Sequence, residues 1–157
     1  MNEIQATLAL LSAENLQKAL EKLENTSIPV FGEMTPQQML EHLCLSIDLS
    51  YTKPFTEGKE ISEMQKQTRL MFLNTENPFP KNLKSPLYKE GMPALKYENL
   101  DSAKDAFLAS VQNFHTHFVN NPTTIYYNML FGKVSFEDLQ IFHFKHILHH
   151  FSQFNLV

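Results

Sequence analysis

The chain has 157 residues, of which 43% are hydrophobic, and its formal net charge is −4 at pH 7. A chain of this length most simply forms one domain, here residues 1–157, whose core is large enough to fold without disulfides, and the single Cys44 cannot form one within the chain. Its Lys and Arg residues are scattered rather than gathered in a basic stripe, which argues against a nucleic-acid partner.

The first five residues carry acidic and amide side chains in place of the basic and apolar stretch of a secretory signal, and no apolar run is long enough to span a bilayer. A lone cysteine suits a reducing compartment. We therefore expect a cytoplasmic protein with no membrane partner. A homodimer is compatible with a domain of this size.

Three helices are predicted in the first half of the chain. Ser12 is a candidate N-cap for a helix over residues 13–23, and the residues before it could add a further helical turn. Thr35 and the residues after it form a capping box with proline at the first helical position, which predicts a helix over residues 36–51. That helix is apolar around most of its circumference, as is typical of a helix buried on several sides. A third helical stretch is expected near residues 61–73.

Residues 52–100, which include this third stretch, contain five prolines and two glycines. Proline fixes φ and removes a hydrogen-bond donor, so regular structure cannot continue through these positions. The segment is too apolar to be a free linker. We expect a long crossover that packs over the domain and roofs a site at one end.

Two more helices are predicted in the second half. One begins near Asp101 or Ser102 and ends before the Asn-Asn-Pro sequence at residues 120–122. The last follows Gly132, is capped at Ser135 and continues to about Phe154. No segment shows sustained period-two alternation, so strands are not expected. The predicted fold is all-α: a four-helix bundle with a long Pro-rich crossover, in which metal sites form between facing helices.

Four of the seven histidines fall within residues 143–150. At about 100° per residue, His143, His146 and His150 share a narrow, inward-facing sector, whereas His149 points about 80° away. Imidazole is the commonest protein ligand for transition metals, and an i, i+4 pair can reach one ion. His146 and His150 are therefore the preferred ligand pair. His143 could be a third ligand, a hydrogen-bond donor to a ligand or a partly exposed residue.

A third ligand should come from another helix, because residues two helical turns apart are about 10 Å apart along the axis. His42 is the only histidine in the other strongly buried helix. Glu41 and Asp48, on the same helix, are candidates for hydrogen-bond acceptors of a ligand or for general bases, or they could equally be solvated at the open edge of the helix. His115 and His117 lie on nearly opposite sides of their helix and cannot share an ion. The alternative is that all the histidines only pack and form hydrogen bonds.

Two motifs resemble those of DinB/YfiT-like proteins. Residues 30–43, VFGEMTPQQMLEHL, are similar to the WGxMTPxQMLxHL string that presents the first metal-binding histidine of that superfamily. FGKVS at residues 131–135 and HILHHFSQF at residues 146–154 are similar to the FGxLS…HxxHHxxQF ending of an uncharacterised branch. The resemblance spans residues 13–156, with two departures: Phe31 replaces a common Trp, and Asn128 stands where a His-Pro pair is common.

The resemblance implies an up-down-down-up four-helix bundle and a divalent metal, commonly zinc or nickel, held by His42, His146 and His150. Three neutral imidazoles leave a coordination position open, as in catalytic sites. Understood members of the superfamily include thiol-dependent transferases and isomerases. We therefore expect a metal-dependent enzyme that activates a thiol or water, with a small-molecule substrate such as a low-molecular-weight thiol. The alternative is a non-catalytic helical bundle.

Overall fold

The computed structural model describes residues 12–74, 76–85 and 88–157. Within them, five helices and one two-stranded sheet follow in the order α2 (Ala13–Glu21), α3 (Pro36–Leu49), α4 (Glu63–Phe72), α5 (Leu100–Asn120), β1 (Tyr126–Asn128), β2 (Gly132–Val134) and α6 (Phe136–Gln153). The fold is therefore mostly helical, as predicted. The further helical turn expected before Ser12 lies outside the described residues. None of the described helices is long and apolar enough to cross a membrane.

Short-range capping explains where the helices begin. The side chains of Ser12, Thr35 and Ser135 accept hydrogen bonds from backbone N–H groups three residues later, as their sequences predict. At α3 and α6 the side chain at the third helical position also bonds back to the backbone of the cap, which completes a capping box. The predicted starts of α2, α3 and α6 are confirmed.

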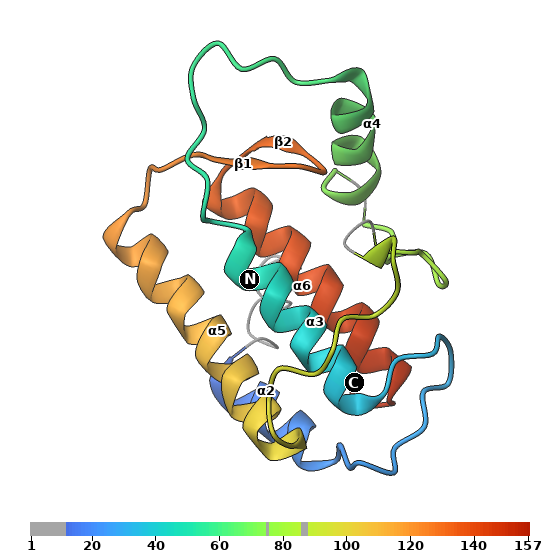
Figure 1. The fold of residues 1–157 in the computed structure, drawn as a ribbon. Coiled ribbons are helices and arrows are strands. Elements are labelled where there is room, and N and C mark those ends of the chain that lie inside the picture. The colour runs from blue at the N-terminus through green and yellow to red at the C-terminus, as the bar shows by residue number, and fades with distance from the viewer. Residues whose placement is uncertain (1–11, 75, 86–87) are drawn as a thin grey trace.

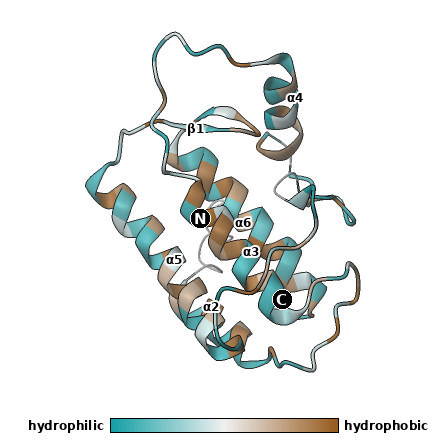
Figure 2. Cartoon of the chain, in the orientation of Figure 1, coloured by the Kyte–Doolittle hydropathy of each residue, from teal (hydrophilic) through white to brown (hydrophobic). Residues whose placement is uncertain are grey.

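Helix α3 packs between α5 and α6, and α2 lies against α5. In Figure 1, α3 and α5 run in the same direction and α6 runs in the opposite direction. Figure 2 shows hydrophobic residues along α3 and α6 where the two helices lie side by side. The core between the helices contains fully buried aromatic and aliphatic side chains, among them Met39, Leu43, Phe107, Leu139 and Phe151. This core holds α3 and α6 at the spacing that the candidate site requires.

The β-hairpin was not predicted, so the all-α expectation needs this correction. Strands β1 and β2 pair antiparallel, with Asn128 opposite Gly132. The Asn128 side-chain oxygen accepts from the backbone N–H groups of Leu130 and Phe131, which closes the turn. Each strand has only three residues, too few for an alternating pattern to be visible in the sequence.

The crossover is anchored through α4. Arg69 Nη2 lies 2.6 Å from both carboxylate oxygens of Asp138, and Nη1 donates to the backbone oxygen of Lys133. Gln65 donates to the Tyr127 hydroxyl and to the backbone oxygen of Met129. These bonds attach α4 to the hairpin and to the start of α6. The segment that follows α4 is thereby directed toward the α3–α6 interface.

Candidate metal centre

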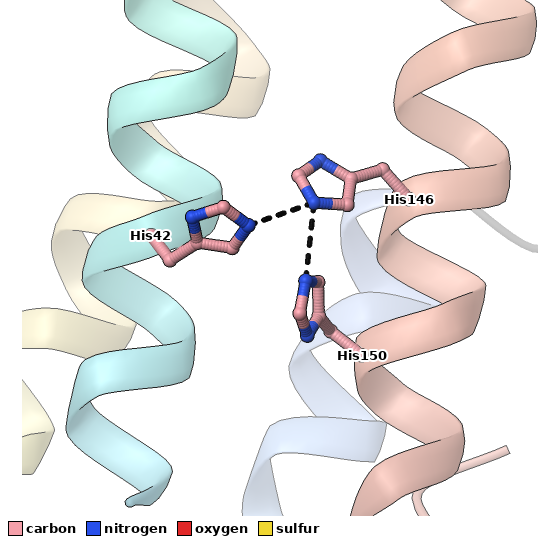
Figure 3. Close-up of side chains that lie close together, drawn as sticks. All are labelled: His42, His146 and His150. Atoms are coloured by element: carbon pink, nitrogen blue, oxygen red, sulfur yellow. Dashed lines mark hydrogen bonds between the residues drawn. The ribbon is translucent and has the colours of Figure 1, made fainter. Parts of the chain in front are cut away.

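Three histidines from two helices meet at the α3–α6 interface. The Nε2 atom of His146 lies 2.9 Å from Nε2 of His42 and 3.1 Å from Nε2 of His150 (Figure 3). All three side chains are buried, and one ring nitrogen from each lies within 4.8 Å of the others. In the described part of the chain, this is the one group of three or more His, Cys, Asp or Glu side chains with such spacing. The structure therefore brings together the three predicted ligands.

Each imidazole also has a hydrogen-bond partner on its outer nitrogen, Nδ1. His42 Nδ1 lies 2.7 Å from the Tyr88 hydroxyl, and His146 Nδ1 lies 3.3 Å from the Ser46 hydroxyl. His150 Nδ1 lies 2.7 Å from the Gln153 side-chain oxygen. Metal-bound histidines almost always have such a partner, because it fixes the tautomer and the direction of the ring.

The Gln153 contact determines the tautomer of His150. The Gln153 amide nitrogen faces the backbone oxygen of Phe31, so the amide oxygen is the end that faces His150. An amide oxygen can only accept, so His150 Nδ1 donates and the Nε2 of neutral His150 carries a lone pair. The hydroxyl groups of Ser46 and Tyr88 can accept from the other two rings in the same way. All three Nε2 atoms would then carry a lone pair, and they lie close together.

The spacing of these atoms suits a metal ion. Ligand nitrogens at about 2.0–2.1 Å from a tetrahedral zinc ion are about 3.3 Å apart. Two of the three pairs here are 2.9 and 3.1 Å apart, and the nitrogens of all three residues lie within 4.8 Å of one another. Imidazole donors suit several first-row transition metals, among them zinc, copper, iron and nickel. Without an ion, one proton on His146 Nε2 can be shared between the other two rings, so the metal-free chain can also hold this arrangement. The donor set and its outer partners therefore fit a divalent transition metal.

Burial keeps the three imidazoles neutral. It lowers the pKa of His42 to about 4, with repulsion from His149 as a smaller cause. It lowers the pKa of His150 to about 3 and that of His146 well below its usual value, and in both cases the neighbouring histidines add to the effect. Neutral imidazole is the form that binds metal. At neutral pH the three rings therefore need not lose a proton before an ion binds.

His143 does not join the cluster. Its Nε2 lies 2.9 Å from the Ser50 hydroxyl, whose own proton is donated to the backbone oxygen of Ile47. His143 must therefore donate from Nε2, and its Nδ1 is the one buried side-chain nitrogen or oxygen in the described residues without a hydrogen-bond partner. The side chain is only 4% exposed, so the partly exposed alternative is wrong. It binds Ser50 and none of the three candidate ligands.

The remaining histidines also lie outside the cluster. His149 is half-buried and its ring packs against those of Phe31 and Phe79. His117 contacts the Tyr126 hydroxyl through Nε2, and His115 packs beside Phe114. None of these belongs to the group that could hold an ion.

The two acidic candidates on α3 do not contact the three histidines. Glu41 accepts from the backbone N–H groups of Lys96 and Tyr97, and so holds the end of the crossover against α3. Asp48 lines a second cavity, on the side of Tyr88 and Cys44. Burial raises the pKa of the Cys44 thiol to about 11, so this thiol is not a nucleophile at neutral pH.

A cavity of about 280 Å³ opens onto the three histidines. Phe79 and Leu83 of the crossover line it, and the Phe79 ring lies 5.8 Å from that of His146. Tyr88, further along the crossover, contacts the Nδ1 atom of His42, the ring nitrogen that faces away from the other two histidines. The crossover therefore covers the site, as the sequence predicted.

Sequence reasoning missed the outer partners Ser46, Tyr88 and Gln153. Gln153 is three residues after its partner His150, so helical spacing could have indicated this contact. Ser46 is four residues after His42 and so shares its face of α3, but its partner is His146 on another helix, which the spacing does not indicate. No sequence signal links Tyr88 to His42, because the two residues are 46 positions apart and Tyr88 lies outside the long helices.

Comparison of the chain with protein-family models, with curated proteins and with solved structures gives no match. The resemblance to DinB/YfiT-like proteins therefore depends on the two motifs alone. The function has to be argued from the geometry of the site.

The Tyr88→Phe variant is expected to bind zinc about 10- to 100-fold more weakly than the wild type. The ring would still fill its place, but His42 Nδ1 would lose the hydroxyl that orients it. Competition with a chromophoric chelator measures the change. Tyr97→Phe is the matched control, because the Tyr97 contacts near α3 use backbone atoms. Equal zinc affinity in the wild type and Tyr88→Phe would contradict this role for Tyr88.

Proposed function

We propose that this protein is a metal-dependent enzyme in which His42, His146 and His150 hold a divalent transition metal, zinc or nickel. The observation that carries the proposal is the convergence of three buried, neutral imidazoles, each with a partner on its outer nitrogen. A structural zinc site is normally closed by four protein ligands, whereas three ligands and an adjoining cavity are typical of catalytic sites. Such an ion lowers the pKa of a bound water or thiol toward neutrality.

The fold supports membership in the DinB/YfiT-like superfamily as part of the same proposal. Helices α3 and α5 run in the same direction and α6 runs against them, as the second, third and fourth helices of an up-down-down-up bundle would. One histidine comes from α3 and two come from α6, in the order that the motifs imply. We propose that the chain is a member whose crossover carries the additional helix α4.

The residues around the histidines would bind and shield a small-molecule substrate. Met34, Leu49, Phe79 and Phe142 give the cavity a mostly apolar lining, which excludes water from the imidazole edges. Tyr88 and the amide of Gln153 hold two of the rings in fixed orientations. We propose transfer of a low-molecular-weight thiol or hydrolysis as the reaction.

Metal content is the direct test. Protein purified without chelator or affinity tag should contain about one transition-metal ion per chain by elemental analysis. Zinc or nickel added to the metal-free protein should raise the melting temperature, because an ion that binds only the folded state stabilises it. A substrate panel with and without low-molecular-weight thiols then separates transfer from hydrolysis. Absence of metal, together with no binding and no thermal shift, would overturn the proposal in favour of a non-catalytic bundle.

A further inference from the structure

Lysines are the one kind of Asp, Glu, Lys or Arg residue among the described residues that line the cavity over the histidines. Lys53 and Lys84 line it, and the described lining residues include neither Asp nor Glu. This is an unusual composition for a chain with 17 acidic residues and a net charge of −4. A second cavity, which His42 and Tyr88 also line, has Glu41 and Asp48 as well as Lys96 in its lining. Of these two cavities, the one over the histidines therefore has the excess of basic over acidic lining residues.

The first lysine is held in place through its backbone. Lys53 follows the end of α3, and its carbonyl oxygen accepts from the N–H of Tyr127 in β1 at 2.7 Å. Its neighbour Pro54 forms a bridge with Tyr126. The hairpin therefore fixes the segment that carries Lys53 beside the cavity. None of the ion pairs found among the described residues involves Lys53.

The second lysine comes from the crossover. Asn82 has a positive φ of 66°, a conformation that asparagine tolerates better than most residues, and this turn precedes Leu83, Lys84 and Ser85. All three of these residues line the cavity. The ion pairs of the described residues do not include Lys84 either. Two exposed lysines from separate segments therefore line the same cavity, and neither forms an ion pair with an acidic residue of the described chain.

The rest of the lining is mostly apolar and the space is small. Met34, Leu49, Phe79, Leu83 and Leu130 contribute hydrophobic surface. A volume of about 280 Å³ suits a small molecule rather than a polymer. A ligand that satisfies this lining needs an apolar body and at least one negative charge. A fully apolar ligand would leave the two lysines unused, and a cationic ligand would be repelled.

We propose that this cavity binds a small organic anion, a carboxylate with an apolar body, whose acid group pairs with Lys53 and Lys84. The inference deepens the proposed function by giving the chemical class of its substrate. The apolar body lies against Phe79 and Leu83, and the same molecule is within reach of the three histidines that line the cavity.

Octanoate and its neutral analogue octanamide test this assignment. Calorimetry at pH 7.5 and low salt with zinc-loaded protein should give about tenfold tighter binding of octanoate, the effect expected of two partly solvated ion pairs. The Lys53→Gln/Lys84→Gln variant should bind the two compounds within about twofold of each other and keep its zinc. The Lys18→Gln/Lys22→Gln variant changes the net charge equally on α2 and its C-cap residue, which do not line the cavity, and should behave as the wild type. Equal affinity for the two compounds in the wild type would overturn the inference.

The metal itself could attract a carboxylate, so a further arm uses the metal-free His146→Ala variant. If this variant still prefers octanoate, and the preference disappears when Lys53→Gln and Lys84→Gln are added, the lysines are the anion site. If the preference depends on zinc and survives both lysine substitutions, the inference is wrong while the proposed metal site stands. If the wild type binds no metal and yet shows the lysine-dependent preference, the metal proposal fails and the inference stands.

Discussion

The His146→Ala variant is expected to purify without metal. His146 is the central residue of the cluster, because its Nε2 lies 2.9 Å from that of His42 and 3.1 Å from that of His150. Its loss would leave two donors on different helices. Replacing a residue that hydrogen-bonds to a metal ligand costs about 10- to 100-fold in metal affinity. Removal of the central ligand itself should therefore cost more than about 100-fold. Elemental analysis and chelator competition measure the loss.

His115→Ala is the matched control for this substitution. His115 lies on α5, outside the cluster, and is half-buried against Phe114. Alanine is a good helix former, so both variants should keep their helices, as circular dichroism can verify. His150→Ala should lose metal as His146→Ala does, and His117→Ala should retain it. Equal metal content in all four variants would refute the assignment of the ligands.

The metal-free protein should lose most of its stability as the pH falls from about 7 to 5. Burial lowers the pKa of His143 and of His150 to about 3, and that of His42 to about 4. In the unfolded chain the same groups titrate near 6.5. Above about pH 6.5 these histidines are therefore neutral in both the folded and the unfolded chain, and their protonation does not change the free energy of unfolding. Below that pH the unfolded chain takes up protons that the folded chain cannot, so stability falls.

The expected size of this effect is large. At pH 5 each of these three histidines favours the unfolded state by about 2 kcal/mol, or about 6 kcal/mol together. His146, whose pKa is also lowered, acts in the same direction. Typical domains have unfolding free energies of only about 5–15 kcal/mol, so acid unfolding should begin above the range in which exposed carboxylates titrate.

Urea unfolding in the presence of a chelator, at several pH values between 5 and 7.5, measures this dependence. The His143→Leu variant is the matched control, because it removes one buried imidazole outside the metal cluster. Near pH 5 its slope of unfolding free energy against pH should be smaller by about 1.4 kcal/mol per pH unit. Stability that does not change between pH 5 and 7 would show that the histidines are not buried as neutral groups.

Several features of the site could be predicted because their determinants are close together in the chain. His146 and His150 are four residues apart on one helix, so the helical period alone puts their rings on one face. The caps Ser12, Thr35 and Ser135 bond to residues only three positions away, and their helices begin where the sequence indicates. His42 was selected because α3 is apolar on most sides, which is a property of that helix alone.

Other features depend on partners far away in the chain. The hairpin strands have three residues each and lie beside Lys53 and Phe55, which precede β1 by about seventy residues. Tyr88 reaches His42 from the crossover, and His143 bonds to Ser50 across 93 positions. The sequence shows that each of these side chains is polar, but not which other group it meets.

The sequence by itself thus determined the helices, the buried face of α6 and the residue types available for a metal. The tertiary structure alone decided that His42 meets His146 and His150, that His143 turns to Ser50 instead, and that two lysines line the cavity above them. The physical reason is the range of the interactions. Capping and helical periodicity act over three or four residues, whereas the packing of α3 against α6 brings together side chains about a hundred residues apart.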